Sequence, residues 1–216
     1  MPKTSPSPYS PLPTDNFVAI DFETADRCQD SACAIGLVRV EGGKIIEKAH
    51  YLIRPPRPQF EFTYIHGISW EDVVEQPDFG QLWPTIEPLL KGTDFFAAHN
   101  ATFDRNILHA CCVAHDISPP SPAFICTVKL ARDAWNLRPT KLPNVCDYLN
   151  IPLKHHDALS DAEACARIVI SANQPSTANR RIVVHCPSCS IPLGVPQGRS
   201  GQISCLRCQH HFAAHT

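Results

Sequence analysis

Two closely spaced cysteine pairs near the C-terminus constrain the fold of this chain more than any other feature. Two residues separate Cys186 from Cys189, two separate Cys205 from Cys208, and fifteen lie between the pairs. This spacing is typical of four thiolates that bind one tetrahedral Zn²⁺ ion. The module around them, of about 35 residues, is too short to fold by burying a hydrophobic core. We therefore expect one structural Zn²⁺ to hold it together.

Charge divides the chain close to the same place. Residues 173–216 contain four arginines and no Asp or Glu, whereas acids outnumber bases in residues 17–172. Residues 173–181 are mostly polar and have no hydrophobic period, which is typical of a linker. The first 16 residues contain five prolines. The sequence thus predicts four parts: a disordered Pro-rich tail (1–16), a core domain (17–172), a linker (173–181) and a small zinc ribbon with four cysteine ligands (182–216).

Cysteine content and hydropathy predict the compartment. The chain has 11 cysteines, and this odd number, without an apolar secretion signal in residues 1–16, argues against a disulfide framework. The seven cysteines outside the two pairs are predicted to be small buried hydrophobic side chains. No apolar run reaches the length of a membrane span, and the net charge of −2 predicts neither membrane nor nucleic-acid binding. We therefore expect a cytoplasmic protein without a membrane partner.

The core domain begins with three strand-like segments and continues as alternating helices and strands. Residues 17–22, 32–40 and 44–53 are rich in β-branched and aromatic residues, and a Gly-Gly turn joins the second to the third. Further strands are expected over 94–98 and 123–126, and helices over 79–90, 101–114, 128–135, 142–149 and 158–172. This order predicts an α/β fold with a mixed five-stranded sheet flanked by helices.

Four carboxylates occupy related positions in these elements. Alternate side chains of a strand share a face, so Asp21 and Glu23 point the same way. Asp104 and Asp161 each flank the apolar stripe of a predicted helix. Carboxylates gathered in one place repel each other, and a divalent cation relieves the repulsion. The pattern therefore indicates a metal site, although two acids at a strand end are also a common way to begin a loop.

Three short motifs give this pattern a family resemblance. Residues 21–24 (Asp-Phe-Glu-Thr), residues 99–104 (His-Asn-Ala-Thr-Phe-Asp), and His156 placed five residues before Asp161 resemble the motifs of the DEDDh 3′–5′ exonucleases. This is the DnaQ-like superfamily of the DNA polymerase III epsilon subunit. The resemblance extends over 17–172 and is to free-standing bacterial epsilon-like exonucleases. It implies a ribonuclease-H-like fold and hydrolysis with two Mg²⁺ or Mn²⁺ ions.

The resemblance also implies a role for each acid. Asp21 is expected to bridge both ions, Glu23 and Asp161 to hold the ion on the side of the nucleophile, and Asp104 to hold the other through water. His156 is expected to be the general base, because imidazole titrates near neutral pH. His155 adjoins it and is an alternative, since only the spacing to Asp161 favours His156.

Six further residues resemble family positions that contact the terminal nucleotide: Phe22, Thr24, His66, His99, Asn100 and Phe103. His66 has a purely structural alternative in a turn before a capping box at Ser69–Asp72, and His99 and Asn100 are equally open to a structural role. Because the core is acidic, the substrate phosphates must bind to the metal ions or to nearby lysine and arginine side chains. The candidate basic side chains are Arg105, Lys129, Arg132, Arg138, Lys141 and Lys154.

The resemblance to epsilon-like exonucleases implies single-stranded or frayed DNA 3′ ends as the substrate, in proofreading or repair. An RNA-trimming enzyme is an alternative, because discrimination of the 2′-hydroxyl depends on pocket shape. An inactive fold used as a binding module is a second alternative. The presence of all five catalytic residues argues against it. The arginines of the zinc ribbon suit either a nucleic-acid or a protein partner.

Overall fold

The computed structural model describes residues 16–173, 181–196, 200–205 and 207–215. Two compact units divide between Ala172 and Asn173. The predicted tail, apart from Asn16, and residues 174–180 of the predicted linker lie outside the described residues. The tail and the linker therefore stay predictions, and each unit is described by itself.

The first unit is built on a mixed five-stranded sheet, as predicted. The strand order is β3-β2-β1-β4-β5. The first three strands along the chain form an antiparallel meander, and β4 and β5 extend it in parallel with β1. Their bounds are β1 Phe17–Thr24, β2 Ala32–Glu41, β3 Lys44–Leu52, β4 Phe95–Ala98 and β5 Ala123–Cys126. The central position of β1 matters because this strand carries Asp21 and Glu23.

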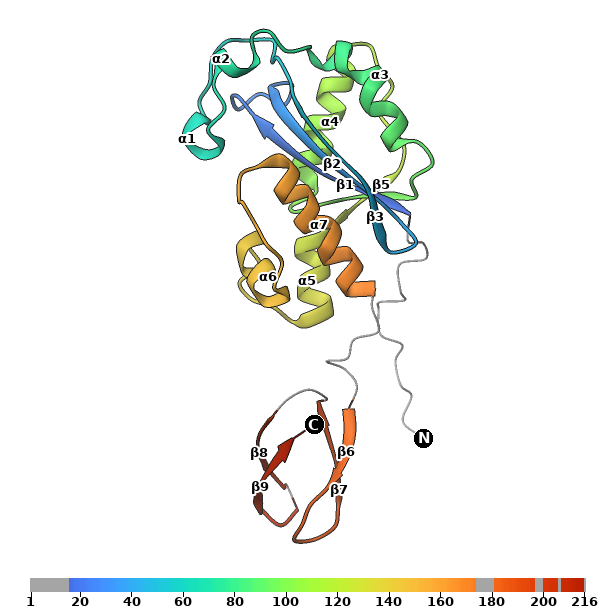
Figure 1. The fold of residues 1–216 in the computed structure, drawn as a ribbon, viewed down its shortest axis with the longest axis vertical. Coiled ribbons are helices and arrows are strands. Elements are labelled where there is room, and N and C mark those ends of the chain that lie inside the picture. The colour runs from blue at the N-terminus through green and yellow to red at the C-terminus, as the bar shows by residue number, and fades with distance from the viewer. Residues whose placement is uncertain (1–15, 174–180, 197–199, 206, 216) are drawn as a thin grey trace. The chain divides into compact units, whose positions relative to one another are not determined.

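Helices cover both faces of the sheet (Figure 1). On one face, α3 and α4 pack against Val18, Ile20 and Phe22 of β1. On the other face, α5, α6 and α7 pack against Phe17 and Ala19. The alternation of β1 side chains therefore divides the core into two layers, as its sequence predicted. The helix bounds are α3 Phe79–Leu90, α4 Thr102–Ala114, α5 Thr127–Trp135, α6 Leu142–Leu149 and α7 Ala158–Asn173.

Two short helices lie between β3 and α3; the first was not predicted, and only the start of the second was, from its capping box. These are α1 (Thr63–His66) and α2 (Trp70–Val73). Gly67 ends α1 in the left-handed region at φ 80°, and Ser69 and Asp72 form a capping box at the start of α2. The capping box was visible in the sequence, but four residues are too few to show a helical period.

The second unit consists of two antiparallel hairpins, as expected for a zinc ribbon. Strand β6 (Arg181–His185) pairs with β7 (Pro192–Pro196). Strand β8 (Ser200–Ser204) pairs with β9 (His211–His215). Each hairpin has a cysteine pair near one end, between the strands that it joins.

Burial confirms most of the predicted cysteine environments outside the pairs. Five of these side chains are buried, and Cys126 is half-buried. The prediction is wrong for Cys28, which is exposed in the loop after β1, where its N–H donates to Asp26 Oδ1 at 2.7 Å. In the described part of the chain, no helix has both the length and the apolar character needed to cross a membrane.

Candidate active site and cysteine cluster

The end of β1 forms the floor of the candidate site. The parallel pairing of β1 with β4 stops at Ala19 and Ala97, so the next residues of β1 extend beyond their neighbour. Asp21 and Glu23 lie in this extension and face the side of the sheet that α7 covers. The early end of β4 thus leaves room beside two carboxylates.

Asp161, in the first turn of α7, completes a group of three carboxylates. Ligand oxygens of Asp21, Glu23 and Asp161 lie within 4.8 Å of one another. Asp161 Oδ2 accepts hydrogen bonds from His155 Nδ1 (2.9 Å) and from the His156 N–H (3.1 Å). Its Oδ1 is buried and has no hydrogen-bond partner among the residues that the structure describes. A buried carboxylate oxygen without a donor, beside two more carboxylates, fits a hard divalent cation such as Mg²⁺ or Mn²⁺.

Asp104 approaches the same strand from the other helical layer. It lies in the first turn of α4 and is 1% exposed. Its Oδ1 accepts the N–H of Phe22 at 3.1 Å, between the two acids of β1. The structure therefore brings all four predicted acids to the end of β1, with Asp104 behind the group of three.

Burial and mutual repulsion raise the pKa values of these acids. Burial, followed by the charges of Asp104, Asp161 and Glu23, raises the pKa of Asp21 well above its usual value. Burial is also the main cause that raises the pKa of Glu23 to about 7 and that of Asp104 to about 7. The pKa of Asp161 is raised by burial although its hydrogen bonds oppose the shift. The cluster thus needs protons or cations to be stable.

A cavity of about 440 Å³ opens beside the three carboxylates. Phe62 and Ile65, from the α1 segment, and Phe103, from α4, give it an apolar side. Phe103 is 43% exposed, which is unusual for a large apolar side chain. The cavity therefore has an apolar side next to a floor of three carboxylates.

Both candidate general bases reach this cavity. The His155 ring contacts Asp161. The His156 ring stacks on the His155 ring, with 3.8 Å between the ring centroids. His156 has φ 66°, a left-handed conformation that few non-glycine residues adopt. Burial and then the neighbouring His155 lower the pKa of His156, which favours the neutral, proton-accepting form. The choice of His156 over His155 stays a prediction.

The predicted substrate-binding residues divide into two groups. Phe22, Thr24, His66, His99 and Phe103 line the cavity. Asn100 is not among the lining residues; it lies in the turn before α4, where its carbonyl accepts the N–H of Phe103.

The ring nitrogens of both cavity-lining histidines in this set are occupied within the protein. His66 Nδ1 accepts the N–H of Ile68 (3.1 Å), so its Nε2 donates to the carbonyl of Thr24 (3.1 Å). His99 Nε2 donates to the carbonyl of Thr140 (3.0 Å), and its Nδ1 accepts the hydroxyl of Thr127 (2.8 Å). Burial lowers the pKa of His99 to about 4, so this ring is neutral. These contacts favour the structural alternative for both rings.

Sequence reasoning did not assign four of the residues that line the cavity to the site. Phe62 and Leu142 belong to no recognised motif, Ile65 belongs to a loop (65–68) that only supports the family resemblance, and Lys141 was only one of six basic candidates. Phe62 and Ile65 belong to the segment of the short helix α1, which the sequence did not reveal. Lys141 and Leu142 mark the start of α6, and nothing in the sequence places this helix beside β1.

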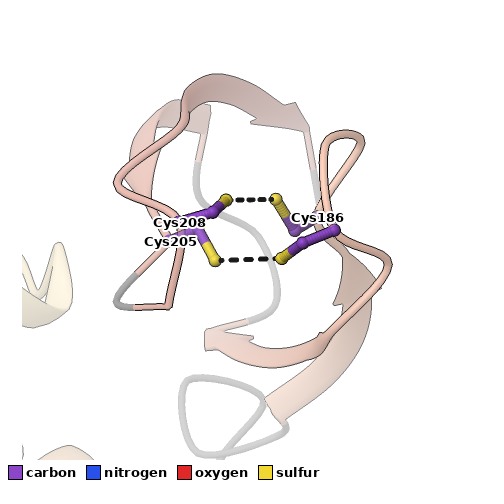
Figure 2. A group of neighbouring side chains, drawn as sticks. Cys186, Cys205 and Cys208 are labelled. Carbon is purple, nitrogen blue, oxygen red and sulfur yellow. Dashed lines mark hydrogen bonds between the residues drawn. The ribbon is translucent and has the colours of Figure 1, made fainter.

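In the second unit, the four paired cysteines converge. The Sγ atoms of Cys186 and Cys208 lie 3.6 Å apart, as do those of Cys189 and Cys205. All four sulfur atoms lie within 4.8 Å of one another, and Figure 2 shows the sulfur atoms of Cys186, Cys205 and Cys208 directed to a common centre. A disulfide needs about 2.05 Å between sulfurs, whereas Zn–S bonds of about 2.3 Å place tetrahedral ligands about 3.8 Å apart. The cluster fits a Zn²⁺ ion.

Two equivalent turns produce this convergence. In the first, the Ser190 N–H donates to the Cys186 carbonyl (2.9 Å); in the second, Gln209 donates to Cys205 (2.8 Å). Ser190 and Gln209 both have left-handed φ angles, of 56° and 59°. Each turn thus directs its two thiols to one side. The spare histidines His185, His210 and His211 are not part of the cluster and are exposed, as predicted.

Comparison with known proteins agrees with this geometry. The chain is 32% identical over 161 residues to a PolC-type DNA polymerase III of Thermotoga maritima, a match that covers 71% of this chain and 12% of the polymerase. It is 34% identical over 162 residues to exodeoxyribonuclease 10 of Escherichia coli, covering 70% of this chain and 66% of that protein. The chain therefore spans only part of these relatives.

Solved structures have the same fold. Exonuclease X in complex with 5′ overhanging duplex DNA has a TM-score of 0.59 and 27% identity, covering 72% of this chain and 90% of that one. The nuclease domain of 3′hExo bound to rAMP, a DEDDh family member, has a TM-score of 0.64 at 19% identity, over 74% and 92% of the two chains, and shows the fold alone. The family model described as Exonuclease (RNase_T) matches residues 18–169. With this match over most of its length, on a ribonuclease-H-like fold, the chain belongs to the RNase_T family of DnaQ-like exonucleases.

Proposed function

We propose that this chain is a metal-dependent 3′–5′ exonuclease that hydrolyses single-stranded or frayed DNA ends to nucleoside monophosphates. The convergence of Asp21, Glu23 and Asp161 within 4.8 Å, with Asp161 Oδ1 buried and without a partner, carries the proposal. The apolar side of the cavity beside them suits the base of a terminal nucleotide. The site is thus suited to hold a strand end and the phosphodiester next to it.

The four acids would hold two Mg²⁺ or Mn²⁺ ions. Asp21 would help to hold both ions, Glu23 and Asp161 would hold the ion on the side of the nucleophile, and Asp104 would hold the other through water. When bound, the ions would lower the pKa of the attacking water and neutralise charge on the reacting phosphate. The cysteine cluster would hold one structural Zn²⁺ ion.

His156 would accept the proton of the attacking water. The water oxygen forms a bond to phosphorus, the bond from phosphorus to the 3′ oxygen breaks, and that oxygen stays on the shortened strand. The lowered pKa of His156 keeps the imidazole neutral near pH 7, as a general base requires. Phe103, Phe62 and Ile65 would orient the terminal nucleotide against the carboxylates.

DNA is proposed as the substrate because of the relatives above. They are a DNA polymerase and an exodeoxyribonuclease by name, and the exonuclease X structure contains duplex DNA. A role in proofreading or repair is proposed on the same ground. The paired thiols and the odd number of cysteines suit a reducing compartment, so we place the activity in the cytoplasm.

A gel time course on 5′-labelled DNA and RNA of one sequence tests the proposal. With Mg²⁺ or Mn²⁺, DNA should shorten from its 3′ end, and EDTA should stop the reaction. Asparagine tolerates the left-handed backbone of His156, so His156→Asn removes the ring with little strain. This variant should lower kcat by about 10²- to 10⁴-fold. The matched His155→Asn variant should instead raise the metal concentration that is needed.

Each contrary result has a defined meaning. The larger loss of kcat in His155→Asn would assign the general base to His155. Faster loss of RNA than of DNA would make the chain an RNA-trimming exonuclease. If the folded, metal-loaded protein cuts neither strand, the enzyme proposal is wrong and a nucleic-acid-binding module takes its place.

A further inference from the structure

Lys141 is the one lysine or arginine among the described residues that line the main cavity. None of the other five basic candidates lines it. The cavity also contains three carboxylates and four histidines. The pKa values of His66, His99 and His156 are lowered, in each case mainly by burial, which favours their neutral forms. Lys141 thus supplies a lasting positive charge on the cavity wall.

The ammonium group of Lys141 is available for a ligand. Lys141 is exposed, and no ion pair or hydrogen bond joins its side chain to another described residue. By contrast, Lys154 pairs with Asp157 (2.9 Å) and Lys48 with Glu163 (2.6 Å). Lys141 shares a cavity with three carboxylates and is paired with none of them.

The backbone before Lys141 is held from two directions. Thr140 is 7% exposed. Its carbonyl accepts the hydrogen bond from His99 Nε2 (3.0 Å), just after β4, and its Oγ1 accepts one from Arg132 Nε (3.0 Å) on α5. Helix α6 begins directly after Lys141. The attachment point of the lysine is therefore fixed, while its long side chain can follow a ligand.

The two sides of the cavity differ in chemistry. Phe62 and Ile65 come from the segment of α1, and Lys141 comes from the start of α6; these helices stand apart along the left of Figure 1. The apolar side suits a base, and the lysine suits a backbone anion. The carboxylates, with their cations, would account for the phosphate that is cut, but not for the charge of its neighbours.

We propose that Lys141 binds a phosphate of the nucleic-acid strand other than the one that is cut. This inference rests on the proposed function and adds a contact that fixes the strand along the cavity. Lysine binds phosphate as a mobile point charge and does not read the base, so the contact serves every sequence equally. Lys141 is therefore a substrate-binding residue that acts through affinity.

Binding of a 5′-fluorescent single strand, measured by anisotropy in Ca²⁺ with the strand verified intact on a gel, tests this contact. Lys141→Gln should weaken binding about tenfold at low salt. It should also reduce the slope of log affinity against log salt by about 0.7, the value for one phosphate contact on a single strand. Lys141→Arg should retain most of the affinity. Lys44→Gln is the matched control, because Lys44 is exposed at the start of β3 and lies outside the cavity.

A scan with neutral methylphosphonate linkages identifies the phosphate. In the wild type, one linkage 5′ of the scissile one should weaken binding when neutral, and Lys141→Gln should show no further loss at that linkage. Equal additional losses of affinity at every linkage in Lys141→Gln would overturn the inference, and so would an unchanged affinity and salt slope in this variant. The proposed function would still stand in both cases if the wild type cuts DNA. Failure of the wild type to bind or cut would reject the proposed function itself.

Discussion

The two oxygens of Asp161 have unlike surroundings. Oδ2 accepts hydrogen bonds from His155 Nδ1 and the His156 N–H, whereas Oδ1 is buried without a partner. Leaving a buried polar atom without a hydrogen bond costs about 1–3 kcal/mol. A cation beside Oδ1 would recover that free energy. Asp161 therefore destabilises the metal-free protein and, for the same reason, favours the metal-bound form.

Asp104 gives a prediction about pH. Burial is the main cause that raises its pKa from 3.8 to about 7. The folded protein therefore keeps this proton up to about pH 7, whereas the unfolded chain loses it near pH 3.8, so stability falls as the pH rises between these values. Asp104→Asn should be more stable than the wild type at pH 8 in EDTA, by about 1.4 kcal/mol for each unit of the pKa shift that acts. The difference should shrink as the pH falls and should vanish only below about pH 3.8, where the carboxyl is protonated in the folded and the unfolded states alike.

Thermal melts of both proteins across this pH range measure the effect. The asparagine keeps Oδ1 as an acceptor for the Phe22 N–H, so the substitution changes charge more than contact. Added Mg²⁺ should raise the melting temperature of the wild type more than that of the variant. A stability difference that does not change with pH would mean that Asp104 is not protonated in the folded, metal-free protein.

At the same scale, the sequence predicted positions better than contacts. Spacing identified Asp21, Glu23 and Asp161, which do converge. It did not predict that the ring of His155, rather than that of His156, hydrogen-bonds Asp161. That contact depends on the left-handed backbone at His156, and loop conformations of this kind leave no periodic signal in the sequence.

At the scale of elements, periodicity succeeded wherever a strand or helix was long enough to repeat. The alternation in β1 predicted its two faces, and the helices α3 to α7 all begin within one residue of their expected positions. The helices α1 and α2 have four residues each, little more than one turn; α1 was missed, and of α2 only the start was predicted, from its capping box. The failure to predict α1 matters because the α1 segment carries the apolar side of the cavity.

Gly36 is the point at which β2 and α7 meet. It is paired with Asp21 in the sheet, and a Cβ atom there would lie 2.0 Å from the carbonyl oxygen of Ala158, at the start of α7. Gly36→Ala must therefore displace the first turn of α7, which carries Asp161. We expect a loss of about 1–3 kcal/mol in the free energy of unfolding. The rise in melting temperature with Mn²⁺ should become smaller.

Denaturant unfolding with and without Mn²⁺ measures both effects. Gly201→Ala is the matched control, because a Cβ at Gly201 meets no atom of the described residues within 4 Å. A Gly36→Ala protein with wild-type stability and an unchanged response to Mn²⁺ would show that α7 adapts without moving its carboxylate.

At the scale of the whole molecule, two units are stabilised by different physics. The first has a two-layer apolar core around a sheet, and the second has two hairpins joined by four thiols. The first therefore gains its stability from buried apolar area. The second is too small for that, and we expect metal–thiolate bonds to stabilise it.

This difference predicts that loss of zinc unfolds one unit alone. Cys205→Ser removes a buried member of the cysteine cluster, so the purified chain should contain less than one Zn²⁺ and the amides of residues 181–215 should lose protection from hydrogen exchange. The first unit should keep its melting temperature and its response to Mn²⁺, because its acids are distant in sequence from the cysteines. Cys146→Ser, in the core of the first unit, is the opposite control and should lower that melting temperature while the zinc content stays at one. If Cys205→Ser instead lowers the melting temperature of the first unit by several degrees, the two units stabilise each other.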